Sequence, residues 1–164
     1  MVADLKDTRS KDVSLRKVFF NLGDDEWHGR SSESLWAEHI SGSKFKLRNS
    51  PFFAKGVSFE DIVEAKEEDG RFIFVRPLIA SGNSTYRLLV EESKIPNPFV
   101  AYWALLEKLG CSHEESDELA LRMYAVDVPS NTDIYAAYRL LEAGKNDGLW
   151  DFEEGHCGHI LDGR

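Results

Sequence analysis

The sequence predicts an α+β protein in which an N-terminal β-rich module packs on a ferredoxin-like α+β sandwich with two helices. Apolar and polar residues alternate with a period of two through most of the first 90 residues, as in half-buried strands. Two later runs have helical spacing and carry start and stop signals. The second half reads strand, strand, helix, strand, helix, strand, an order typical of a ferredoxin-like sandwich.

Three strands are expected before residue 50. Residues 15–22 are apolar and β-rich. Residues 34–40 form the second strand, with Leu35 and Ala37 on the same side. Residues 44–48 alternate strictly, which predicts a half-buried strand whose outer face carries three positive charges. The ordinary role of such a face is contact with solvent.

Residues 49–65 are predicted to form a corner that attaches the β-rich module to the rest of the chain. Asn49-Ser50-Pro51 favours a turn followed by extended backbone. Phe52 and Phe53 supply two large apolar side chains, and Gly56 permits a tight backbone before an extended run resumes.

A hairpin is predicted after the corner. Residues 71–79 read as a strong strand with Pro77 near its end, and residues 85–90 are expected to pair back on it across the turn at Gly82-Asn83.

The first helix is the clearest element of the second half. Asn97 and Pro98 are a favourable N-cap and first-turn pair, and Gly110 ends the run. Its apolar residues recur at helical spacing: Phe99, Trp103, Leu106 and Leu109. Residues 111–117 read as an acidic connection or a short helical turn, and residues 119–128 as a strand.

A second helix should begin at the capping sequence Ser130-Asn131-Thr132-Asp133 and end at Gly144. Its inward residues are expected to be Ile134, Ala137, Tyr138 and Leu141. A last strand over residues 149–153 would place Trp150 and Phe152 on one face. The predicted organisation is a flexible N-terminus (1–14), a β-rich module (15–70), the α+β part (71–155) and a C-terminal tail (156–164).

Charge and composition restrict the function. The net charge of −9 and pI near 5.0 argue against nucleic-acid binding and favour a basic protein partner. Two cysteines do not suggest a secreted disulfide framework. No stretch resembles a signal peptide or a membrane span, so the sequence predicts a cytoplasmic protein without membrane contact.

A set of short motifs spread over residues 17–154 resembles a bacterial family known as domain of unknown function 4265. The motifs are Leu35-Trp36, Asn49-Ser50-Pro51-Phe52, Gly56-Val57-Ser58, Asp61-Ile62-Val63, Ser81-Gly82-Asn83-Ser84-Thr85-Tyr86-Arg87, Leu109-Gly110-Cys111 and Val128-Pro129. The resemblance implies no chemistry for individual residues. Small acidic domains of this kind are similar to immunity proteins of bacterial toxin systems.

Two groups of residues carry ligand chemistry. Cys111, His113, Cys157 and His159 have the side chains that zinc prefers, although their spacing differs from paired zinc knuckles, and ordinary polar or buried roles are the alternative. Arg87 follows the turn at residues 81–83 and is a candidate anion-binding residue, with a plain strand role as the alternative. No cofactor is predicted.

The chain lacks the common catalytic motifs, so the sequence predicts a protein that is not an enzyme. The leading hypothesis is an immunity or antitoxin-type module that binds and neutralises a basic toxin. The alternative is a ligand-binding or regulatory domain that uses the crevice between the two halves. The proposed partner-binding residues are Trp150, Asp151, Glu153, Glu154, Glu114 and Glu115; Trp150 would serve either as an exposed hot spot or as an inward core residue.

Overall fold

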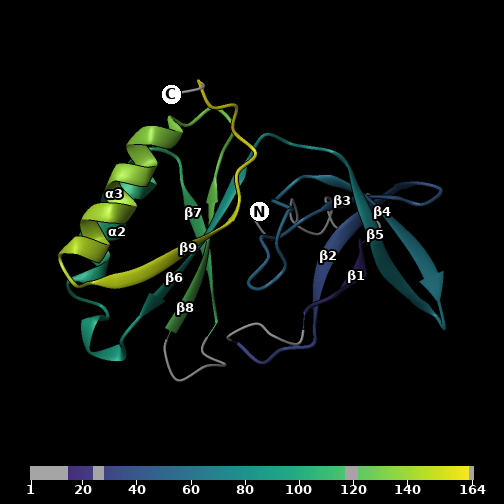
Figure 1. Cartoon of the computed structure of the whole chain (residues 1–164), viewed down its shortest axis with the longest axis horizontal. Helices are drawn as coiled ribbons and strands as arrows, with labels where there is room; N and C mark the ends of the chain where they lie inside the picture. Colours follow the sequence, from purple (N-terminus) through teal and green to yellow (C-terminus); the bar gives the residue numbers. More distant parts are fainter. Residues whose placement is uncertain (1–14, 24–27, 117–121, 163–164) are drawn as a thin grey trace, which may run out of the picture.

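The computed structural model describes residues 15–23, 28–116 and 122–162, which form two packed units (Figure 1). The first is a five-stranded barrel, and the second is a four-stranded antiparallel sheet with two α-helices on one face. The described ranges contain nine strands and two α-helices, which confirms a strand-rich α+β fold. The N-terminal segment 1–14, expected to be flexible, lies outside the described residues.

The barrel is built from consecutive antiparallel strands. They are β1 (Leu15–Asn21), β2 (Ser32–Ser41), β3 (Lys44–Leu47), β4 (Ile62–Glu68) and β5 (Arg71–Ile79). Because an odd number of up-and-down strands ends in its starting direction, β5 closes the barrel by pairing with β1 in parallel, through Val18↔Phe72 and Phe19↔Ile73. The three strands predicted before residue 50 are thus confirmed. Their inward residues form an apolar core with Val57, Val63 and Ala65.

The prediction for residues 71–90 is wrong in its pairing. Residues 71–79 are the strand that closes the barrel, so they do not belong to the sheet of the second half. Strand β6 (Ser84–Val90) follows after four residues, but it pairs with β8 and β9 rather than folding back on β5. The turn at Gly82-Asn83 therefore carries the chain from one unit to the other.

The second unit follows the order β6, η1, α2, β7, β8, α3, β9. The elements that follow β6 are η1 (Glu92–Lys94), α2 (Phe99–Lys108), β7 (Ser112–Ser116), β8 (Arg122–Val128), α3 (Ile134–Asn146) and β9 (Trp150–His156). The strands lie in the order β7-β8-β6-β9, and every neighbouring pair is antiparallel. Residues 112–116, expected to be a connection or helical turn, instead form the edge strand β7, because they pair with β8.

The helices cover one face of this sheet with an apolar core. Phe99, Trp103 and Leu106 of α2 are buried there, as the helical spacing predicts. Helix α2 begins at Phe99 with Pro98 as its N-cap and without a side-chain cap, so the capping role expected for Asn97 is not observed. Asp133 caps α3, where its side chain accepts hydrogen bonds from the N–H groups of Tyr135 and Ala136.

Gly144 does not end α3, which continues to Asn146. It lies against Trp150, since a Cβ at position 144 would approach the indole to 2.3 Å. The indole N–H donates to the carbonyl of Leu141 at 2.9 Å. Glycine at 144 is thus required by close packing of the helix on β9 rather than by the helix terminus. No helix in the described part of the chain is long and apolar enough to cross a membrane.

Candidate functional site

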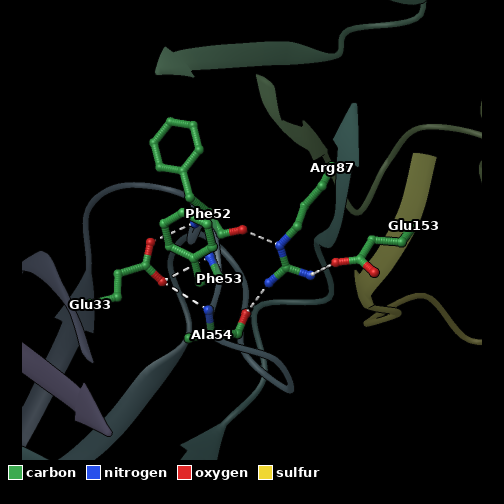
Figure 2. A network of polar contacts seen from close by, with 6 residues as sticks. All are labelled: Glu33, Phe52, Phe53, Ala54, Arg87 and Glu153. Atoms are coloured by element: carbon green, nitrogen blue, oxygen red, sulfur yellow. Dashed lines mark hydrogen bonds and ion pairs between the residues drawn. The ribbon is translucent and has the colours of Figure 1, made fainter. Parts of the chain in front are cut away.

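The corner predicted around Phe52 and Phe53 lies between the barrel and the uncovered face of the sheet. Glu33 on β2 holds it from the barrel side (Figure 2). The carboxylate accepts hydrogen bonds from three consecutive backbone N–H groups, those of Phe52 at 2.6 Å, Phe53 at 3.1 Å and Ala54 at 2.8 Å. A carboxylate bound by several backbone donors is a strong, directional anchor for a loop.

Arg87 on β6 holds the same loop from the sheet side (Figure 2). Its guanidinium donates to the carbonyls of Phe52 and Ala54, and it pairs with Glu153 on β9 at 3.4 Å. The side chain is only 1% exposed. Arg87 passes over Gly155, where a Cβ would lie 2.8 Å from Nη1. The carboxylate of Glu33 thus binds the N–H groups of the loop, and the guanidinium of Arg87 binds its carbonyls. We call Glu33, Arg87 and residues 52–54 the junction clamp, because together they join the two units.

The groups around Arg87 decide between its candidate role in anion binding and a structural role. The guanidinium lines a pocket of about 330 Å³ together with Leu89, Lys145, Asp151, Phe152 and Glu153. Two carboxylates in that lining oppose an anion, and the donors of Arg87 already serve protein carbonyls. The geometry therefore favours the structural role of this arginine.

A second polar network joins the units nearby. Asp61 accepts hydrogen bonds from the N–H groups of Ser58 and Ser81 and from the Ser81 hydroxyl. The Ser58 hydroxyl meets Nδ1 of His156 at 2.8 Å and accepts from Thr85 Oγ1 at 2.8 Å. These groups come from the corner, the linker, β6 and β9, so hydrogen bonds link all four segments across the junction.

Asp127 on β8 is the most perturbed acid of the junction. It is 7% exposed, and its Oδ1 has no hydrogen-bond partner among the described residues. Burial is the main cause, and the nearby carboxylates of Glu60, Glu114 and Asp61 the second, that together raise the pKa of this carboxyl from 3.8 to about 7. The acidic stretches that begin at residues 60 and 114 therefore meet here, at one point between barrel and sheet.

The candidate partner-binding acids do not all converge. Glu114 and Glu115 lie on β7, whereas Asp151, Glu153 and Glu154 lie on β9, and these strands are the two opposite edges of the sheet. Three strand spacings of ~4.8 Å place the two sets ~14 Å apart. A single contact patch formed by both sets is not what this order of strands provides.

Several of these acids already have partners within the chain. Glu153 pairs with Arg87, and Glu114 accepts a hydrogen bond from the Ser50 N–H at 2.7 Å. Glu115 pairs with Arg122, and Asp151 pairs with Lys145, both at 3.3 Å. Glu154 accepts from the Tyr86 hydroxyl at 3.4 Å, which together with burial raises the pKa of that phenol.

Trp150 is 5% exposed and packs in the core beneath α2 and α3, so it is the inward residue of the two alternatives. The exposed aromatic residue at this edge is Tyr138 of α3, which is 41% exposed although the helical pattern placed it inward. Its ring contacts Phe152 of β9 at 5.7 Å between centroids. An aromatic residue beside the acids of β9 thus exists, but it comes from the helix.

The candidate zinc ligands occupy ordinary structural positions. Cys111 is buried, which raises the pKa of its thiol to about 12, and His113 packs edge-on against Trp103 at 4.5 Å, where burial lowers its pKa. Both ring nitrogens of His159 are used, by the Ser84 hydroxyl and the Pro129 carbonyl. Within the described ranges no three His, Cys, Asp or Glu side chains are grouped as a metal ion requires. Both cysteines, Cys111 and Cys157, are free thiols.

Sequence reasoning did not single out Glu33 or Asp127. Asp127 lies in the apolar run Ala125-Val126-Asp127-Val128, and an acid within such a strand is a detectable signal of a buried carboxyl. Glu33 gives no comparable signal, because the three N–H groups that it binds lie 19 to 21 residues further along the chain.

Comparisons with known proteins agree with this fold. A structure described as "Novel crystal structure of a hypothetical protein from Neisseria gonorrhoeae" is similar with a TM-score of 0.72 and 19% sequence identity, over 90% of this chain and 97% of that chain. At this identity the likeness concerns the fold alone. No curated protein matches the sequence. The profile of a family described as "Domain of unknown function (DUF4265)" matches residues 33–152, and the chain therefore belongs to the DUF4265 family.

Proposed function

We propose that this protein is a cytoplasmic interaction module of the immunity or antitoxin type, which binds a basic protein and neutralises it. The observation that carries the proposal is the division of charge between the two units. Residues 15–80 contain 10 Lys and Arg against 11 Asp and Glu, whereas residues 81–164 contain 7 against 15. An acidic surface accelerates association with a basic partner and imitates a phosphate backbone.

The contact surface proposed here is the α3–β9 edge, defined as Tyr138, Glu142, Asp151, Phe152 and Glu154. Tyr138 and Glu142 are four residues apart on α3 and so lie on one face of the helix. Tyr138 contacts Phe152; on β9, Asp151 directly precedes Phe152 and Glu154 follows it by two residues. An exposed aromatic ring beside carboxylates is the arrangement expected of a hot spot, because rim charges alone contribute mainly to the association rate.

The proposed mechanism is binding rather than catalysis. The carboxylates would attract a cationic surface, and Tyr138 would be buried against it on contact. Lys145, which pairs with Asp151 and lies 5.9 Å from the Phe152 ring, is a cation that a partner's lysine or arginine would displace. The free thiols support action in a reducing compartment such as the cytoplasm.

We also propose the ferredoxin-like assignment for the second unit. The succession β6, α2, β7, β8, α3, β9 and the antiparallel strand order β7-β8-β6-β9 support it. In such a sandwich the helix-free face is left for a further contact, and in this chain the barrel and its corner occupy that face.

One observation favours a second candidate function, the binding of a small ligand at the junction. A pocket of about 600 Å³ lies where the linker, the start of α3 and the C-terminal segment meet; it is lined by Ala80, Ser81, Gly82, Ser130, Thr132, Asp133, Ile134, Tyr135, Gly158, His159 and Ile160. This volume falls within the range of ligand pockets, and its hydroxyl groups would suit a polar ligand.

The interaction proposal is tested by co-expressing the chain with the products of its neighbouring genes and measuring association with any co-purified protein. The parent should bind faster at low salt than at high salt. A variant that combines Tyr138→Ala, Asp151→Lys and Glu154→Lys should associate at least about tenfold more slowly. Reversal of Glu67 and Glu68 on β4 is the matched control and should change little. No complex with any neighbour, or a complex indifferent to salt and to these changes, would contradict the proposal.

A further inference from the structure

The outer wall of the barrel carries a row of alternating cations and aromatic rings. Three pairs make up this row: Arg71 lies 5.0 Å from the Phe19 ring, Lys17 lies 5.0 Å from the Trp36 ring, and Arg48 lies 5.6 Å from the Phe59 ring. We call these six residues the cation–aromatic row. None of them contributes to the junction clamp or to the α3–β9 edge.

Strand pairing places the three pairs next to one another. Lys17 on β1 is directly opposite Trp36 on β2, and Phe19 is the next outward residue along β1, opposite Ile73 of β5. The Arg48 N–H, just after β3, donates to the carbonyl of Trp36 at 2.8 Å. The row therefore runs across β5, β1, β2 and β3, a width of ~14 Å at ~4.8 Å per strand.

The charges of the row and its Trp36 ring are accessible, whereas the Phe19 and Phe59 rings are half-buried. Trp36 is 47% exposed, which is unusual for the largest apolar side chain, and Lys17, Arg48 and Arg71 are exposed. Lys46 adds a fourth cation on the same outer face, opposite Glu38. Strand pairing places two acids beside these cations, Glu38 opposite Lys46 and Glu68 opposite Arg71. The local balance is thus positive, although the whole chain is acidic.

We infer that the cation–aromatic row is a binding surface for single-stranded nucleic acid. Such surfaces combine aromatic rings, on which bases stack, with cations that contact the phosphates between them. A cation beside each ring supplies both parts at every step of the row. The net charge of −9 weakens this binding at long range, but most of that charge belongs to residues 81–164, on the other unit.

The cations alone would also attract an acidic polypeptide, so nucleic acid must be distinguished from that ligand. Stacking requires the exposed ring, whereas attraction of carboxylates requires only the charges. Trp36 is therefore the residue that decides between them, and Lys17 and Arg48 report the electrostatic part.

The experiment titrates the full chain with a fluorescein-labelled oligouridylate at low ionic strength, and with poly-glutamate as the competing polyanion. Binding should weaken as salt rises. Trp36→Ala should lower the affinity about fivefold or more, the lower limit of what one stacking ring contributes. Lys17→Gln combined with Arg48→Gln should reduce the slope of log affinity against log salt by about one to two. Leu105→Ala, at a half-exposed apolar residue of α2 on the other unit, is the control and should leave binding unchanged.

Absence of oligouridylate binding would overturn the inference, as would binding that Trp36→Ala leaves unchanged. Equal binding of poly-glutamate that depends on Lys17 and Arg48 but not on Trp36 would assign the row to acidic polypeptides instead. Trp36→Phe keeps an aromatic ring and should retain most of the affinity. A thermal melt of each variant separates loss of binding from loss of fold, because the half-exposed Trp36 lies outside the barrel core.

Discussion

The four-stranded sheet buries both of its faces, and it does so with different chemistry. The face under α2 and α3 is a continuous apolar core that includes Phe99, Trp103, Tyr124 and Trp150. The face toward the barrel buries Met123 and Ala125, but it also buries Arg87, Asp127 and Thr85, and directional hydrogen bonds join it to the corner. One sheet therefore shows how apolar contacts provide bulk stability, while polar contacts fix how a second unit is placed.

The helix-covered face should be the most sensitive to loss of volume. Trp103 is 8% exposed and stacks near Phe99, so Trp103→Ala removes a large buried ring from the centre of this core. The free energy of unfolding should fall by about 3–5 kcal/mol. Chemical denaturation of parent and variant measures this difference. A loss below about half a kcal/mol would show that α2 is not a core element.

The contacts of the barrel-covered face should be weakened when a single donor side chain is removed. Arg87→Met keeps most of the side-chain volume but leaves the carbonyls of Phe52 and Ala54 and the Glu153 carboxylate without their partner. The expected loss is about 3 kcal/mol, because two backbone carbonyls lose a charged donor, whereas the remaining Glu153 carboxylate is 36% exposed and reaches water.

A double-mutant cycle with Glu33→Gln sharpens this test of the clamp. Glu33 binds the N–H groups of residues 52–54 and Arg87 binds two carbonyls of the same loop, so the two substitutions should be non-additive by about 0.5 kcal/mol or more. Strict additivity would mean that the loop does not transmit the effect of one side to the other. Asp151→Asn at the sheet edge serves as a control of small effect.

The two faces should also respond differently to pH. The pKa of Asp127 is about 7 in the folded protein against an ordinary 3.8, so the folded state binds the proton more tightly than the unfolded state. The stability of the parent should therefore fall by about 2–3 kcal/mol from about pH 5 to about pH 8, as this carboxyl ionises beside Glu60, Glu114 and Asp61. Asp127→Asn should remove most of this fall. An identical pH dependence in both proteins would contradict the assignment.

A smaller loss of stability is expected when the close packing of the apolar face is disturbed. Gly144→Ala would gain about 1 kcal/mol from helix propensity alone. Because the added methyl group would meet the buried indole of Trp150, the net result should be a loss of about 1–2 kcal/mol. Thermal unfolding measures the sign. A stabilised variant would show that α3 moves away from β9 at little cost.

The apolar face could be predicted from the sequence because its pattern repeats within a few residues. Phe99, Trp103 and Leu106 repeat at helical spacing, and all three are buried. The same holds for the barrel strands, whose period of two places Leu35, Ala37, Phe45 and Leu47 inside. Periodicity within a few residues suffices to identify the buried side of an element.

The contacts of the polar face could not be predicted from the sequence, because they join residues that are far apart along the chain. Arg87 meets carbonyls 33 and 35 residues away and a carboxylate 66 residues away. Barrel closure likewise depends on β1 meeting β5, and nothing in residues 71–79 distinguishes this pairing from a hairpin with β6. Gly144 was misread for the same reason, since its neighbour Trp150 comes from the next strand. Tyr138 fits the apolar stripe of α3 but lies at its boundary.

The residues of the junction clamp are synthesised in the order Glu33, residues 52–54 and Arg87, and this order matters for folding on the ribosome. All five barrel strands precede residue 80, so the barrel is complete in sequence before the sheet has begun to emerge. At that stage the loop at residues 52–54 has Glu33 but neither Arg87 nor Glu153. The nascent barrel thus carries a carboxylate-anchored loop that still lacks its arginine, and β9, which leaves the ribosome after β6, brings the carboxylate that pairs with Arg87.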